Sequence, residues 1–168
     1  MPDNAKGRVS ANTLPSNIKS KFRGNLDFNI ATALASSSGQ GWIYAEKDIS
    51  TSSADILGTT EDYITTTGAG AVATGDKLLW ICIEHTGTTD GSANTSEGIV
   101  VCLDGGTAAY NLVDGIFIGP NETMVIKAPN TTIANFHGIT VAVTNGVPSS
   151  DGSSTGRVRI AAILQNVG

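Results

Sequence analysis

The chain has 168 residues, of which only 15% are charged, and its formal net charge is −5. A chain of this length can bury roughly 70% of its unfolded surface in a single core, so we expect one domain. Helix-forming Glu, Lys, Arg, Gln and Met are scarce, while Gly, Ser, Thr, Ala and Asn are abundant, which excludes a helical body and favours short strands joined by loops.

Membrane and disulfide-rich classes are also excluded. No segment approaches the roughly 18 consecutive apolar residues of a membrane-spanning helix, and no apolar segment follows the basic residues near the N-terminus. We therefore expect no membrane insertion and no export signal. Two cysteines are too few for a disulfide scaffold, so we expect reduced thiols inside apolar strands.

Charge is unevenly distributed along the chain. Residues 1–24 hold five basic residues and one acid, whereas the remainder holds five basic residues and fourteen acids. A basic arm before an acidic body is typical of a segment that reaches a neighbouring subunit, a larger assembly or nucleic acid; a solvated terminus is the alternative. The predicted partner-binding residues of this arm are Lys6, Arg8, Leu14, Ile18, Lys19, Lys21, Phe22 and Arg23.

The conformation of the arm has two interpretations. Leu14, Ile18 and Phe22 are spaced by four, which suits one short amphipathic helix with Ser16 as its cap. An extended arm docked in a groove fits equally well. We divide the chain into a basic arm and linker, residues 1–40, and a β-sandwich domain, residues 41–168.

The body shows about eight strand signals bounded by Gly, Pro, Asn or Ser. Residues 157–164 and 123–128 alternate strictly, which is typical of sheets with one buried face. We predict an all-β fold, an antiparallel two-sheet β-sandwich, with a jelly roll as the first topology and an immunoglobulin-like sandwich as the second. The Cys-Trp-Cys spacing of true immunoglobulin domains is missing. The predicted strands are 42–49, 54–57, 78–86, 98–103, 115–118, 122–128, 138–144 and 157–164.

Two of these strands, Leu78–Thr86 and Gly98–Leu103, are predicted to pair as antiparallel neighbours through the loop GTTDGSANTSE. A symmetric register would place Cys82 opposite Cys102. Two thiols packing as small hydrophobic groups is favoured over a redox pair.

Residues for catalysis are few. The two histidines, His85 and His137, lie outside HExxH, CxxC, GxSxG and Walker patterns. We expect a surface or core-edge role for His85, on the strand face opposite Glu84, and a backbone or intersubunit contact for His137. We predict a protein that is not an enzyme, with no catalytic residue, cofactor or metal ligand.

The loops and the aromatic residues limit the kinds of ligand that the protein is expected to bind. The segment Asp90–Glu97 lacks the ligand spacing of a calcium loop, so we interpret it as a structured loop. An acidic body and only nine aromatic residues in the whole chain exclude sequence-specific nucleic-acid binding. A carbohydrate-binding sandwich stays possible, with Trp42, Tyr44, Tyr63 and Tyr110 as candidate platforms, although Trp42 and Trp80 are expected in the core.

Three features together resemble a known family: the arm with FRGNLDFNIA, the low-charge Thr/Gly/Ser-rich β body, and the stretch YNLVDGIFIGPNETMVIKAPNTTIANFHGITVAV. They resemble small virion structural proteins of tailed bacteriophages, most of all capsid decoration or cement proteins. Gly115–Asn130 resembles the strand, turn, strand units of such sandwiches.

The resemblance implies a protein that is made in the bacterial host cytoplasm and located on the virion. It would sit on the outside of an assembled capsid, often as a homotrimer, and clamp neighbouring major capsid subunits, so its partners would be the major capsid protein and itself. One alternative is a tail or head-to-tail accessory protein, including a receptor-binding one, that uses the loops Gly87–Glu97 and Thr144–Gly156. The other is a carbohydrate-binding β-sandwich module.

Overall fold

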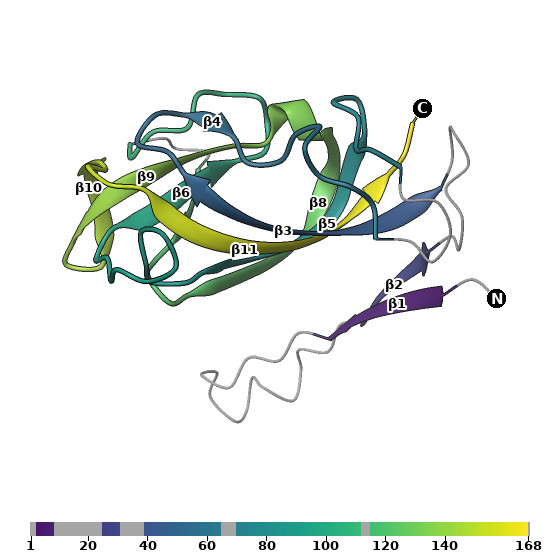
Figure 1. The fold of residues 1–168 in the computed structure, drawn as a ribbon, viewed down its shortest axis with the longest axis horizontal. Helices are drawn as coiled ribbons and strands as arrows, with labels where there is room; N and C mark the ends of the chain where they lie inside the picture. The colour runs from purple at the N-terminus through teal and green to yellow at the C-terminus, as the bar shows by residue number, and fades with distance from the viewer. Residues whose placement is uncertain (1–2, 9–24, 31–38, 65–69, 112–114, 168) are drawn as a thin grey trace.

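The structure is a computed structural model that describes residues 3–8, 25–30, 39–64, 70–111 and 115–167. Its regular elements are almost all strands (Figure 1). They are β1 (Asp3–Arg8), β2 (Asn25–Ile30), β3 (Gln40–Ile49), β4 (Ala54–Asp55), β5 (Lys77–His85), β6 (Gly98–Cys102), β7 (Ile116–Ile118), β8 (Thr123–Thr132), the 3-10 turn η1 (Ile133–Asn135), β9 (His137–Thr144), β10 (Val147–Asp151) and β11 (Gly156–Gln165).

The body from β3 onward is a two-sheet sandwich. One sheet has the order β3-β11-β5-β8, and the other has the order β10-β9-β6-β7 with β4 also paired to β9. Every pairing is antiparallel. With β10 set aside, the sheets read first-eighth-third-sixth and second-seventh-fourth-fifth, which is the strand order of a jelly roll. The predicted all-β sandwich and its first-choice topology are confirmed.

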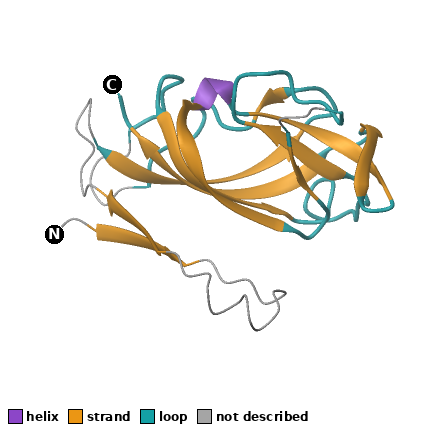
Figure 2. Ribbon diagram, turned by 180° about the vertical axis from the view of Figure 1, so that it is seen from behind, coloured by secondary structure: helices purple, strands orange, loops and turns teal. Residues whose placement is uncertain are grey.

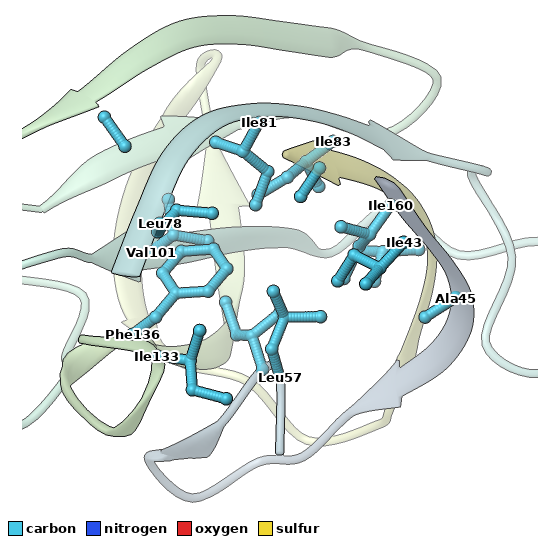
Figure 3. Close-up of a cluster of buried hydrophobic side chains, with 14 of the residues drawn as sticks. Ile43, Ala45, Leu57, Leu78, Ile81, Ile83, Val101, Ile133, Phe136 and Ile160 are labelled. Atoms are coloured by element: carbon cyan, nitrogen blue, oxygen red, sulfur yellow. The ribbon is translucent and has the colours of Figure 1, made fainter. Parts of the chain in front are cut away.

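The alternation of apolar and polar residues along the strands places the apolar side chains in the core. Along β11, Val158, Ile160, Ala162 and Leu164 are buried in the main hydrophobic cluster, as their period of two predicts. Leu78, Ile81 and Ile83 reach the same cluster from β5 of the same sheet. Val101 reaches it from β6 of the other sheet and Ile133 from the turn η1, so both sheets and this turn build the core (Figure 3). Burying each of these Leu or Ile side chains stabilises the fold by about 1.5–3 kcal/mol.

Strand β10 is not among the predicted strands. It forms a hairpin with β9 through the two-residue turn Asn145–Gly146, in which both residues have positive φ, 53° and 80°. Such a turn matches the right-handed twist of paired strands, and an Asn-Gly pair is its usual sequence. The dipeptide was therefore a signal for one more strand, although β10 itself, VPSSD, has little strand propensity.

The predicted pairing of the strands that carry the two cysteines is wrong. β5 pairs with β11 and β8 in one sheet, whereas β6 pairs with β7 and β9 in the other. Cys82 therefore lies opposite Ala161 and Val125, and Cys102 lies opposite His137. The two cysteines do not form a disulfide. The twelve-residue connection 86–97 is long enough to cross from one sheet to the other, so strands that are neighbours in the sequence lie in different sheets.

The N-terminal residues that the structure describes form a separate two-stranded sheet. β1 pairs with β2, with Lys6 opposite Asp27 and Arg8 opposite Asn25. Figures 1 and 2 show this hairpin projecting from the sandwich near the end where β3 begins. The arm thus doubles back on itself. The helix predicted around Leu14, Ile18 and Phe22 lies outside the described residues.

Candidate interaction surface

The outward face of the sheet β3-β11-β5-β8 carries an aromatic row. The strand register places Trp42, Ile163, Trp80 and Lys127 side by side across the four strands. The two indole rings meet edge to face, with centroids 5.6 Å apart and planes at 84°. Ile163 is only 1% exposed because these rings and Leu79 pack around it. The two tryptophans were expected in the core, but they form their own small cluster outside it.

Exposed apolar side chains extend this row. Tyr44 and Val125 lie in the next row of the sheet and are 51% and 36% exposed. Ile64 is 59% exposed, and its amide donates a 2.7 Å hydrogen bond to the carbonyl of Trp42, so it borders the row at the edge of β3. Contiguous exposed apolar side chains on a soluble protein mark a contact surface for another molecule. We call Trp42, Tyr44, Ile64, Trp80 and Val125 the aromatic patch.

The other half of the same face is a ladder of charges. Arg159 lies between Glu46 and Glu84, with Nε 3.2 Å from the Glu46 carboxylate and Nη1 3.6 Å from the Glu84 carboxylate. Arg157 pairs with Asp48 one row further on. The Tyr44 hydroxyl and Arg159 together lower the pKa of Glu46. Most of these groups are exposed, so the ladder contributes little to stability and chiefly sets a charge pattern that a partner would have to match.

The predicted arm residues are only partly placed by the structure. Lys6 and Arg8 lie in β1. Figures 1 and 2 show the hairpin near the start of β3, and Trp42 of the aromatic patch is the third residue of that strand. An isolated two-stranded ribbon is marginally stable in water and needs packing partners. The remaining predicted residues, Leu14, Ile18, Lys19, Lys21, Phe22 and Arg23, lie outside the described part of the chain.

A second prominent region is the end of the sandwich where β5 stops and β6 begins, which we call the loop end. Here the carboxylate of Glu97 accepts four hydrogen bonds, from the amides and hydroxyls of Ser153 and Ser154, at 2.8–3.1 Å. Thr155 donates to the carbonyl of Thr89 at 2.9 Å. The two candidate loops, Gly87–Glu97 and Thr144–Gly156, are therefore bonded to each other. The sequence carried no signal for this clamp, because its partners are more than fifty residues apart.

The loop Asp90–Glu97 is a structured loop, as predicted. Oδ1 of Asp90 accepts hydrogen bonds from the Ser92 amide, the Ser92 hydroxyl and the Ala93 amide at 2.9–3.0 Å. These bonds, led by the Ala93 amide, lower the pKa of Asp90 to about 2. Oδ1 of Asp90 thus stabilises the turn itself.

The histidines lie at opposite ends of the sandwich. His137 bridges two segments: Nδ1 is 2.8 Å from the Gly106 carbonyl and Nε2 is 3.0 Å from the Asp55 carboxylate, so the expected backbone contact is confirmed. His85 is fully buried at the loop end, deeper than the expected surface or edge position. Within the described residues there is no group of three His, Cys, Asp or Glu that could hold a metal ion.

The aromatic platforms proposed for carbohydrate binding are not gathered on one surface. Tyr63 is 1% exposed and donates its hydroxyl to Asp76 in the core, so its candidacy was wrong. Tyr110 is 39% exposed but lies in the connection after β6, away from the aromatic patch. In the described residues, no helix is long and apolar enough to cross a membrane.

The chain shows little similarity to known proteins. No protein-family model matches the chain, and no curated protein matches it. Among solved structures, a chain of the "Cyanophage Pam1 capsid asymmetric unit" aligns with 90% of this chain and 99% of its own length, at 12% sequence identity and a TM-score of 0.30. That chain belongs to a phage capsid. A likeness of this size carries no argument about the present protein.

Proposed function

We propose that this protein is a non-enzymatic structural subunit of a tailed-bacteriophage virion that binds the outside of an assembled capsid and clamps neighbouring subunits. The observation that carries the proposal is that the β1–β2 hairpin projects near the end of the sandwich where β3 begins, close to Trp42, the first residue of the aromatic patch along that strand (Figure 1). A rigid face beside a projecting arm is suited to contacting two neighbours at once.

The charge distribution supports the same arrangement. The basic arm, within residues 1–40, would lie on an adjacent subunit, while the acidic sandwich, residues 41–168, would face outward and keep a densely covered particle soluble. The partners would be the major capsid protein and further copies of this chain, as a homotrimer, on a virion assembled in the bacterial cytoplasm.

The mechanism is mass action. A subunit whose contacts come from two neighbouring capsid proteins binds the assembled lattice and not the free capsid protein. Each bound copy therefore lowers the free energy of the assembled state by linkage. No covalent chemistry is required. The stabilisation comes only from contacts that form once the capsid has assembled.

The test is binding to undecorated capsids of the cognate phage, with the bound copies counted by calibrated gel densitometry. We expect the full-length protein to saturate at hundreds of copies. A Tyr44→Arg, Val125→Arg variant, which places charge in the aromatic patch, should lose binding at least tenfold. The matched control is Ser149→Arg on exposed β10, which should bind normally. Absence of binding by the native protein would overturn the proposal.

The chief second candidate is a tail or head-to-tail accessory protein. It is favoured by the loop end, where the Glu97 clamp presents two loops as one fixed surface. Copy number separates the candidates, since twelve or fewer copies per particle is expected of a tail or neck protein. A carbohydrate-binding module would instead bind glycans as an isolated monomer, which a glycan array would detect.

A further inference from the structure

The loop end contains a buried histidine that the proposed capsid contact does not use. His85 is the last residue of β5 and is 0% exposed, with its ring on the inner face that Ile81 and Ile83 also occupy. A methyl group on Gly156 would lie 3.2 Å from His85 Nε2, so the ring is closed in by backbone on that side. The ring is thus part of the packing beneath the loops.

One ring nitrogen supports the start of the loop. The Gly87 amide donates a 3.0 Å hydrogen bond to His85 Nδ1. Gly87 has a φ of 73°, and a Cβ there would lie 2.4 Å from Asn121, so the position that donates this bond requires glycine. Because Nδ1 accepts, the neutral ring carries its proton on Nε2. Nε2 makes no hydrogen bond of ordinary geometry with the described residues.

A second proton is chemically incompatible with this arrangement. In the imidazolium both ring nitrogens are donors, so Nδ1–H would face the Gly87 N–H, and one of the two groups must move away. The charge would also sit between the sheets without solvent. Burial accordingly lowers the pKa of His85, and the backbone of Glu97 offsets only part of that effect.

The surrounding charged groups do not relieve the imidazolium. Glu84 points to the outer face, where it meets Arg159. Glu122 contributes its backbone carbonyl to the His85 amide. The Glu97 carboxylate is occupied by Ser153 and Ser154. Asp90 is engaged in its own turn, and Arg157 pairs outward with Asp48.

Movement at Gly87 would spread through the loop end. The Gly87 carbonyl accepts from the Thr95 amide at 2.9 Å, which closes the loop on itself. The Arg157 amide donates to the Thr88 carbonyl at 2.8 Å, which joins this loop to the start of β11. Loss of the Gly87 position therefore weakens bonds within this loop and its bond to the start of β11, directly after the loop Thr144–Gly156.

We propose that His85 is an acid-sensitive latch: the neutral ring holds the loops Gly87–Glu97 and Thr144–Gly156 together, and protonation of the ring opens this end of the sandwich. The sign follows from linkage. A histidine with a depressed pKa in the closed state favours closure above its ordinary pKa of about 6.5, and that preference is lost as pH falls below it. The device is independent of the capsid contact, which lies on another face.

The test is hydrogen exchange by mass spectrometry on the full chain at pH 7.5 and pH 5.0, with rates corrected for intrinsic chemistry. We expect opening of peptides covering 87–97 to increase at least about fivefold at pH 5.0, with β11 core peptides unchanged. The carboxylates of Glu97 and Asp90 stay ionised in this window, because their pKa values are lowered.

His85→Asn keeps an acceptor for the Gly87 amide but has no titrating ring, so its loop should show no pH response. His137→Asn, at the opposite end, is the matched control and should respond as the native protein does. An equal response in His85→Asn, or none in the native protein, would overturn the proposal.

Nuclear magnetic resonance titration of the native protein decides the matter if His85→Asn does not fold. The His85 ring and the Gly87 amide should titrate together with a pKa below 6.5. A Gly87 amide that ignores the titration of His85, or a His85 pKa at or above 6.5, would refute the latch.

Discussion

The hydroxyl of Tyr63 donates a 2.7 Å hydrogen bond to Oδ2 of Asp76, and both residues are buried. The same carboxylate accepts from the amide of Ala73 at 2.9 Å and from the amide of Val167 at 3.1 Å. One buried acid therefore holds together the segment before β5, the edge of the core and the last residues that the structure describes. Burial and this bond raise the pKa of Tyr63, so the phenol stays a donor at all ordinary pH values.

Replacing Tyr63 by Phe should lower the free energy of unfolding by about 1.5–3 kcal/mol, because it removes a donor to a buried carboxylate without changing the ring. Urea unfolding followed by fluorescence measures the change. Tyr44→Phe removes an exposed hydroxyl that donates to Glu46 and should change stability by less than about 0.5 kcal/mol. Equal decreases in the free energy of unfolding of the two variants would show that the buried hydrogen bond stabilises the protein no more than the exposed one.

The Glu97 clamp predicts a dependence on pH. Burial alone would raise the pKa of Glu97, but the hydrogen bonds from Ser153 and Ser154 outweigh it and leave the pKa below its ordinary value of 4.5. Its contribution to stability is therefore present above pH 4.5 and is lost as pH falls through the lower folded value. Glu97→Gln should cost about 1 kcal/mol at pH 7.

The difference between Glu97→Gln and the native protein should shrink toward zero in acid, as measured by denaturant unfolding between pH 3 and pH 7. Exposed Glu46→Gln serves as the control and should stay within about 0.5 kcal/mol of the native protein at pH 7. A cost for Glu97→Gln that is the same at pH 3 and pH 7 would contradict the role of the carboxylate charge.

The β9–β10 turn offers a clean backbone test. Gly146 has a φ of 80° and nothing within 4 Å of where a Cβ would lie, so Gly146→Ala adds backbone strain without a clash. The expected cost is about 1–2 kcal/mol. Gly70 also has open space around it but is not in the positive-φ region, so Gly70→Ala should be neutral or slightly stabilising. Thermal unfolding of the two variants compares the effects; a neutral Gly146→Ala would count against the turn.

The two thiols should remain separate under oxidation, because Cys82 and Cys102 lie in different sheets. Cys82, which is partly exposed, should react first with a maleimide, and its reaction should be slow since burial raises its pKa. Buried Cys102 should react only after unfolding. Mass spectrometry of the native protein after copper-catalysed oxidation checks this: an intramolecular disulfide would refute the sheet assignment.

Local pattern predicted most strands of the body and their buried faces. In β11, the alternation of Val158, Ile160 and Ala162 with Arg157 and Arg159 was sufficient to separate the core face from the outer face. The reason is that the pleat places successive residues on opposite sides wherever the strand lies. The Asn145–Gly146 dipeptide carried a similar local signal for a hairpin, because few residues accept two successive positive φ values.

The interaction surface was predicted less well. The arm was identified by its charge, but its pairing into β1 and β2 depends on a register between segments about twenty residues apart. Trp42, Ile163 and Trp80 form one row only because three strands that are far apart in the sequence are neighbours in the sheet. Neither the β1–β2 pairing nor the aromatic row produces a periodic pattern within a single segment of the sequence.

The sequence by itself thus determined an all-β body, most of its strands and the faces that they bury, and a basic arm ahead of it. Only the tertiary structure decided that β5 and β6 lie in different sheets, that Glu97 reaches Ser153 and Ser154, and that His85 is covered rather than exposed at its strand end. Hydrophobic periodicity and strand propensity are properties of residues that are neighbours in the sequence. The order of the strands and the burial of a strand end depend on which distant segments pack against them. The packing of the whole core decides that arrangement.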